Sequence, residues 1–130
     1  FYRYGKPLLK EMKLHGSVTD YAMLTAVANA EGSRLELVQP LYGDTIFQEH
    51  AEKFGYGGIH HFGLAVDDIQ EAIQVSSRAG FNVVMEGSGY VLDGDGHFAY
   101  LDTERSLGIT IELMERPKRR HEPLRVYPHA

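Results

Sequence analysis

Three ionisable side chains interrupt short stretches of alternating apolar residues that are otherwise typical of β-strands. They are Glu36, His61 and Glu112, within the stretches Arg34–Val38, Ile59–Val66 and Gly108–Met114. Successive side chains of a strand point to opposite faces, so each ionisable group faces away from its apolar neighbours. A charge in the middle of a strand costs free energy unless it is solvated, paired or bound to a metal. Three such groups in one small chain predict a lined cavity with the chemistry of a metal site.

The same alternation predicts which neighbouring side chains are buried. Leu35 and Leu37 are expected to enter the core on the face opposite Glu36. Ile111 and Leu113 are expected to do the same around Glu112. The three ionisable groups would then share one surface of the protein, facing the cavity.

The length and composition of the chain restrict its class. Its 130 residues suffice for one domain, or for two small fused modules, with a buried core. The net charge of −5 argues against nucleic acid or an anionic membrane as a partner, because both attract basic surfaces. No apolar run is long enough to cross a bilayer, so we expect no membrane partner. The absence of cysteine fits a cytoplasmic location and leaves nitrogen and oxygen as metal ligands.

The second half of the chain follows the order strand, helix, strand, strand, strand. Asp68 followed by Glu71 is typical of a helix start, and Gly80 is typical of a helix stop. Gly87–Gly89 and Gly94–Gly96 are typical of turns. The predicted strands cover 58–66, 81–86, 97–101 and 109–114, and the predicted helix covers 68–79.

The first half repeats the later part of this order. Strands are predicted over 1–4, 21–30 and 34–38, with a tight turn at 31–33. If the halves are repeats of one βαβββ unit, Glu36 and Glu112 occupy equivalent positions on the final strands. The counterpart of His61, with a leading strand and helix, would then belong upstream of Phe1. The chain has neither an initiator Met nor a signal-peptide pattern, so we expect that its true start is missing.

We expect four parts along the chain. Residues 1–42 form an N-terminally incomplete first βαβββ module, 43–57 a linking helix, 58–116 a second βαβββ module and 117–130 a C-terminal tail. Asp44 is expected to cap the linking helix. The basic run Arg116–His121 could meet an anionic substrate or another subunit. We expect it to be a solvated extension without a role in the chemistry.

Three motifs follow one another in a fixed order: Leu35–Leu41, then Gly57–Phe62 shortly before Asp67-Asp68, then Gly108–Leu113. Together they resemble the glyoxalase, bleomycin-resistance and extradiol-dioxygenase superfamily, the vicinal-oxygen-chelate proteins, over nearly the whole chain. Within it the pattern is most similar to the methylmalonyl-CoA epimerase branch. That branch usually carries His-Pro-Lys before the final strand, where this chain has Leu101–Ser106. The segment Ala99–Thr103 instead resembles the lactoylglutathione-lyase-related proteins.

The resemblance implies an α+β fold of paired βαβββ modules that form a curved mixed sheet around a cleft, the first module lacking its leading strand and helix in this chain. It implies that Glu36, His61 and Glu112 bind a divalent ion (Zn²⁺, Co²⁺, Ni²⁺, Mn²⁺ or Fe²⁺) and that Glu112 and Glu36 are the catalytic carboxylates. The expected protein is a homodimeric isomerase or lyase that moves a proton next to the carbonyl of a small molecule or an acyl-CoA. A glyoxalase I-like lyase, an Fe²⁺ ring-cleaving dioxygenase and a metal-free drug-sequestering protein are the alternatives.

The remaining histidines are expected to be structural. His60 is predicted to pack against the helix over 68–79 or to reach a backbone carbonyl, and His50 to lie on a face of the linking helix. His97 and Tyr100 are predicted to pack within the sheet, although one of them could line the cavity. Solvated positions in loops or in the tail are expected for His15, His121 and His129.

Overall fold

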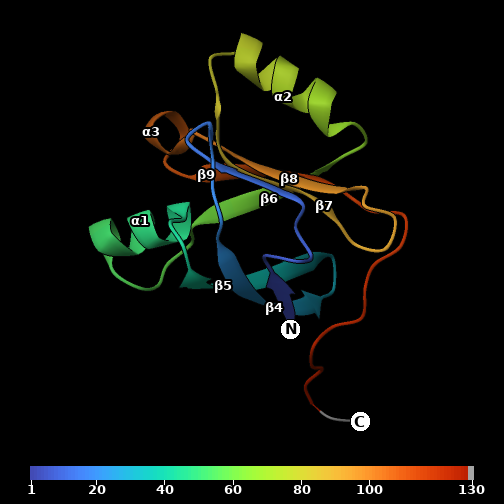
Figure 1. Ribbon diagram of the computed structural model, residues 1–130. Helices are drawn as coiled ribbons and strands as arrows, with labels where there is room; N and C mark the ends of the chain where they lie inside the picture. The colour runs from blue at the N-terminus through green and yellow to red at the C-terminus, as the bar shows by residue number, and fades with distance from the viewer. Residues whose placement is uncertain (129–130) are drawn as a thin grey trace.

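A computed structural model of the chain describes residues 1–128, which form two β-sheets and three helices (Figure 1). The strands are β1 (Tyr2–Tyr4), β2 (Glu11–Leu14), β3 (Ser17–Val18), β4 (Ala22–Ala30), β5 (Ser33–Tyr42), β6 (His61–Val66), β7 (Val83–Tyr90), β8 (Gly96–Leu101) and β9 (Thr110–Glu115). The helices are α1 (Ile46–Phe54), α2 (Ile69–Arg78) and α3 (Glu104–Leu107). The smaller sheet has the order β1-β4-β5, and the larger has the order β3-β2-β7-β8-β9-β6. The α+β class with curved, open sheets is the one that the sequence predicts.

The second half of the chain follows the predicted order. Strand β6 lies parallel to β9 at one edge of the larger sheet, whereas β7, β8 and β9 are antiparallel neighbours. Helix α2 begins where the Asp68 side chain accepts a 2.9 Å hydrogen bond from the backbone N–H of Glu71. Gly80 follows the helix with a φ of 91°, the left-handed conformation that ends many helices. The order is therefore β6, α2, β7, β8, β9, which is a βαβββ unit.

The first half contains the three predicted strands and an unpredicted hairpin. Strands β1, β4 and β5 form the smaller antiparallel sheet, with β4 and β5 joined at Glu31-Gly32. Strands β2 and β3 form an antiparallel hairpin that belongs to the larger sheet, where β2 pairs antiparallel with β7. Strand β2 spans only four residues, in which Met12 and Leu14 alternate with charged residues. So short an alternation cannot be distinguished from a loop in the sequence.

The prediction of a turn at Gly87–Gly89 is wrong. These residues lie inside β7, which runs to Tyr90, with an irregularity in its pairing to β8 after Ser88. A Cβ atom at Gly87 would lie 2.5 Å from Cζ of Phe98, so close packing, not a turn, requires glycine there. Gly89 has a φ of 73° at the irregularity, as expected for a β-bulge.

Two local predictions in the first half are also wrong. The cap of α1 is Thr45 instead of Asp44, because the Thr45 hydroxyl accepts a hydrogen bond from the backbone N–H of Gln48. Leu35 and Leu37 are 61% and 64% exposed, because no helix of the described residues covers the outer face of the smaller sheet (Figure 1). The corresponding prediction on β9 is confirmed for Leu113, which is buried.

Two apolar clusters hold these elements together. The larger lies between the two sheets and includes Tyr21 and Met23 from one side with Met85, Phe98 and Tyr100 from the other. The smaller lies between α2 and the opposite face of the larger sheet, around Ile69 and Leu113. Figure 1 shows α2 on the face of the larger sheet that is turned away from the smaller sheet. In the described part of the chain, no helix combines the length and apolar character needed to span a membrane.

Candidate active site

A cavity of about 920 Å³ lies between the two sheets and continues past α1. Its walls come from β1, β5, α1, β6, β8, β9 and the segment after β9. Aromatic side chains form much of the lining, including Tyr4, Phe47, Phe98 and Tyr100. All three ionisable residues singled out in the sequence, Glu36, His61 and Glu112, also line it. Their expected arrangement around one cavity is therefore present.

Glu112 is a buried residue of the cavity lining. It is a β9 residue whose cross-strand neighbours are Gly63 on β6 and Tyr100 on β8, and it is only 5% exposed. Burial raises the pKa of its carboxyl to about 8, and the nearby charge of Glu36 adds to the rise. A hydrogen bond with the Tyr100 hydroxyl acts in the opposite direction on this pKa. The carboxyl is therefore mostly protonated at pH 7 when no cation is near.

His61 stands beside Glu112 at the start of β6. Its Nε2 atom lies 3.6 Å from Oε2 of Glu112, and its side chain is 9% exposed. Burial lowers its pKa to about 4, so the ring is neutral at pH 7. A neutral imidazole has a lone pair that can bind a metal or accept a proton.

Gly63 leaves space next to this pair. It follows His61 by two residues on β6, so a side chain there would point to the same face. A Cβ atom would lie 3.2 Å from Oε2 of Glu112 and 2.6 Å from Cε of Met114. The missing side chain keeps the Glu112 carboxyl open to the cavity.

Glu36 approaches from the other sheet. It is a half-buried residue of β5, paired with Val27 of β4. Burial raises the pKa of its carboxyl, while the charge of Arg34 opposes the rise. Within residues 1–128 no group of three or more His, Asp or Glu side chains is arranged so that it could hold an ion. The structure thus brings His61 and Glu112 together and places Glu36 in the same cavity, close enough to affect Glu112 by its charge.

Comparison with known proteins identifies the family. A model described as the Glyoxalase/Bleomycin resistance protein/Dioxygenase superfamily matches residues 9–101. The chain belongs to this superfamily. The matched segment contains Glu36 and His61 and ends before Glu112. No curated protein sequence matches the chain.

The superfamily fold is also found in a solved structure. A hypothetical protein from Bacillus halodurans C-125 matches with a TM-score of 0.51 and 23% sequence identity, covering 88% of this chain and 79% of that chain. This similarity concerns the fold.

The donor atoms of this superfamily member fit a divalent ion. Two ligand atoms bound to one ion at roughly 2.1 Å and at a tetrahedral angle lie about 3.4 Å apart. The 3.6 Å between Nε2 of His61 and Oε2 of Glu112 is close to that spacing. A carboxyl whose pKa is raised to about 8 by burial and by the charge of Glu36 is also a group that a cation would stabilise in its ionised form. His61 and Glu112 fit as a pair, whereas Glu36 lines the same cavity without completing a group of three ligands in residues 1–128.

His60 supports His61 in a way that the sequence does not indicate. The Nδ1 atoms of the two rings lie 3.1 Å apart, so one ring donates a hydrogen bond to the other. His60 also makes a hydrogen bond to the backbone of Ile46. If the remaining nitrogen of His60 donates to that carbonyl, its Nδ1 must accept from Nδ1 of His61. His61 then keeps a free lone pair on Nε2, the atom that faces Glu112.

The surroundings of His60 agree with one of its two predicted alternatives, since it reaches the backbone of Ile46, and differ from the other. Its ring packs against α1, with centroid distances of 4.8 Å to Phe47 and 4.9 Å to His50, and not against α2. Its pKa is lowered to about 4, mainly by burial and to a smaller extent by the nearby rings of His61 and His50. His50 lies on a face of α1, as expected, and stacks on Phe54 and His60.

Other predictions on individual residues had mixed outcomes. Tyr100 was expected to pack in the sheet, but it also lines the cavity beside Glu112, and its hydroxyl pKa is raised well above the usual value by burial. His97 instead lies 3.1 Å from Glu86, outside the cavity lining. His15 is exposed and lies 2.7 Å from Glu49. His121 is not a solvated tail residue, since it packs on Tyr2 and Tyr4 and lines the cavity. His129 lies outside the described residues.

Proposed function

We propose that the protein is a metal-dependent enzyme that moves a proton next to a carbonyl group, as an epimerase, isomerase or lyase. The observation that supports this most is the buried Glu112 carboxyl 3.6 Å from neutral His61 in a cavity large enough for a small substrate. Membership of the glyoxalase superfamily agrees with such a reaction. The resemblance of the motifs makes methylmalonyl-CoA the first substrate to test.

His61, Glu112 and Glu36 would hold the ion. Their nitrogen and oxygen donors suit Zn²⁺, Co²⁺, Ni²⁺, Mn²⁺ or Fe²⁺. When bound, the ion would polarise the substrate carbonyl as a Lewis acid and stabilise the charge of an enolate oxygen.

The carboxylates are suited to proton transfer. Glu112 reaches the cavity from β9 in one sheet, and Glu36 reaches it from β5 in the other. One carboxylate would take the proton from the carbon next to the carbonyl, leaving the C–H electron pair on the enolate. The other carboxyl would return a proton from the second side, which inverts the carbon.

Solvent deuterium exchange at the α-carbon of methylmalonyl-CoA tests this proposal. Protein supplied with Co²⁺ should exchange the proton, and Glu112→Gln should slow the exchange about 10²- to 10⁴-fold, the usual contribution of general acid–base catalysis. Glu86→Gln is the matched control, because Glu86 is a sheet carboxylate that pairs with Lys13 and His97 outside the cavity. Near-normal exchange in the Glu112 variant would contradict the assignment. Oxygen consumption without exchange would favour the dioxygenase alternative.

The aromatic lining favours a second candidate, a ligand-sequestering protein. Flat side chains such as Phe47 and Tyr4 could stack on an aromatic compound without any metal. Elemental analysis of the purified protein separates the candidates. Stoichiometric divalent metal supports the enzyme, whereas ligand binding by protein that takes up no metal supports sequestration.

A further inference from the structure

The basic segment after β9 is anchored to the body of the protein, although Arg116, Lys118, Arg119 and Arg120 are exposed to solvent. The backbone N–H of Lys118 donates to Asp95 at 3.1 Å, and the Arg119 side chain pairs with Asp93. Further along, the backbone N–H of Leu124 donates to the carbonyl of Phe1 at 2.8 Å. The segment is therefore held at both ends.

Between these anchors the segment runs along the cavity. The His121 ring packs edge-on against Tyr2 and Tyr4 of β1, with centroid distances of 5.6 and 6.4 Å. Arg116 and Arg120 line the cavity together with His121. Figure 1 shows the chain leaving β9 and passing toward the smaller sheet. Two guanidinium groups are thus presented at the cavity by a backbone that is held in place.

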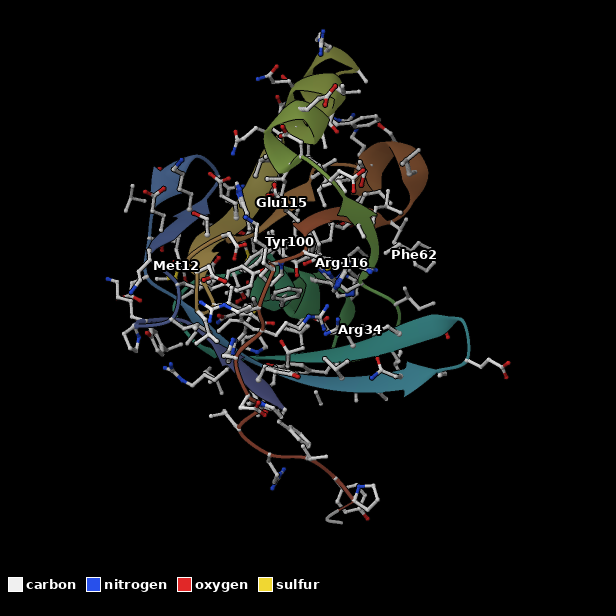
Figure 2. The ribbon with its side chains drawn as sticks, turned by 90° about the vertical axis from the view of Figure 1, so that its right-hand side faces the viewer. Met12, Arg34, Phe62, Tyr100, Glu115 and Arg116 are labelled. Atoms are coloured by element: carbon white, nitrogen blue, oxygen red, sulfur yellow. The ribbon has the colours of Figure 1, made fainter. Side chains whose placement is uncertain are left out.

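A third guanidinium reaches the same cavity from a distant part of the sequence. Arg34 belongs to β5 in the smaller sheet, and Figure 2 shows Arg34 and Arg116 on opposite sides of the space between the sheets. Within residues 1–128, Arg34, Arg116 and Arg120 all lack a carboxylate within 4.0 Å. Arg119, the neighbour that points elsewhere, is ion-paired.

One acidic group of the lining is turned to another partner. The Glu115 carboxylate accepts a 2.9 Å hydrogen bond from the backbone N–H of Ile69, at the start of α2. Within residues 1–128 it forms no ion pair with Arg34, Arg116 or Arg120.

We propose that Arg34, Arg116 and Arg120 bind an oxyanion group of the substrate, a carboxylate or a phosphate, at the cavity mouth. Guanidinium groups bind both through paired N–H donors, and groups from two sides can clamp one anion. The carbonyl end of the substrate would then point toward Glu112, an orientation that rests on the proposed function. The fixed segment after β9 would select for anionic substrates.

Calorimetric titration of the full chain tests the anion site without turnover or metal. The probes are pyrophosphate for a phosphate source and succinate for a carboxylate source, at constant ionic strength. One variant is Arg116→Gln with Arg120→Gln. Its matched control is Arg78→Gln with Arg105→Gln, which removes the same charge at exposed positions outside the cavity lining and leaves the anchors of the segment in place. Arg34→Gln tests the site from β5, outside the segment.

We expect saturable binding of at least one probe by the unmodified chain, and the preferred probe identifies the source of the anion. The Arg116/Arg120 variant and the Arg34 variant should each weaken binding tenfold or more, and the control by less than twofold. No saturable binding of either probe, or equal weakening by both double variants, would overturn the proposal. If the protein binds the anion but shows no deuterium exchange, the proposed function is contradicted and the anion site stands.

Discussion

At the scale of single residues, burial has opposite effects on the two groups at the centre of the cavity. It keeps Glu112 protonated up to a pKa of about 8 and keeps His61 neutral down to a pKa of about 4. At pH 7 both groups are therefore mostly uncharged in the absence of a cation. A divalent ion would displace one proton from the carboxyl and bind the imidazole as it stands.

The hydrogen bond that His61 donates to His60 should matter for metal binding. His60→Ala removes the partner of Nδ1 of His61 and with it the constraint on ring orientation. We expect the affinity for Co²⁺ to fall about 10- to 100-fold, as is usual when such a partner of a metal-bound histidine is lost. Calorimetry measures this affinity. His97→Ala is the control, because His97 pairs with Glu86 outside the cavity lining. An equal loss of Co²⁺ affinity in the His97 variant would contradict a specific role of the hydrogen bond between His60 and His61.

At the scale of elements, the close approach of β7 and β8 depends on a glycine. In Gly87→Ala the new methyl group would meet Cζ of Phe98 at 2.5 Å and the Tyr21 hydroxyl at 3.0 Å. We expect a loss of about 1–3 kcal/mol in the free energy of unfolding, typical of overpacking. Chemical denaturation measures it. Ser88→Ala, at the next position of β7, should cost much less, and equal effects of the two changes would show that packing is not the reason for the glycine.

The sequence predicted those elements whose signals are local. Helix α2 has an acidic cap at Asp68 and a glycine stop at Gly80, and both signals are used as expected. Gly87–Gly89 carried an equally strong turn signal, but the bulky Phe98 on the adjacent strand decides its conformation. Strand β2 exists because it pairs with β7, more than 70 residues away in the chain. Such long-range pairings have no local signature.

The candidate site was predictable to a similar extent. Alternation along β9 and β6 correctly placed Glu112 and His61 toward one cavity, because a strand fixes the direction of its side chains. The roles of His60, Tyr100 and His121 depend on contacts with α1, β9 and β1, which the sequence pattern does not reveal.

At the scale of the whole molecule, the smaller sheet has an uncovered apolar face. Leu35 and Leu37 of β5 are more than half exposed, although the alternation of the strand suggested burial. We expect a second copy of the chain to cover this face, in line with the expected homodimer. Burial of such apolar side chains on association is favourable.

Light scattering after size-exclusion chromatography tests this expectation. The unmodified chain should elute as a dimer and Leu37→Asp as a monomer, because the charge would be buried without a partner. Val18→Asp is the control, since Val18 lies on β3 of the other sheet and is already exposed. A monomeric unmodified chain, or a dimer that tolerates Leu37→Asp, would contradict the expectation.

The most direct measurement on the central pair is a calorimetric titration with Co²⁺ at pH 7 in two buffers of different ionisation enthalpy. We predict that one ion binds per chain. Binding should release about nine-tenths of a proton from Glu112, because a carboxyl of pKa about 8 is mostly protonated at pH 7. Any proton released from Glu36 adds to this amount. The proton release should decline as the pH rises through about 8, and Glu112→Gln should abolish tight binding. No saturable binding, or equally tight binding by the Glu112 variant, would contradict the assignment of Glu112 and His61 as a metal-binding pair.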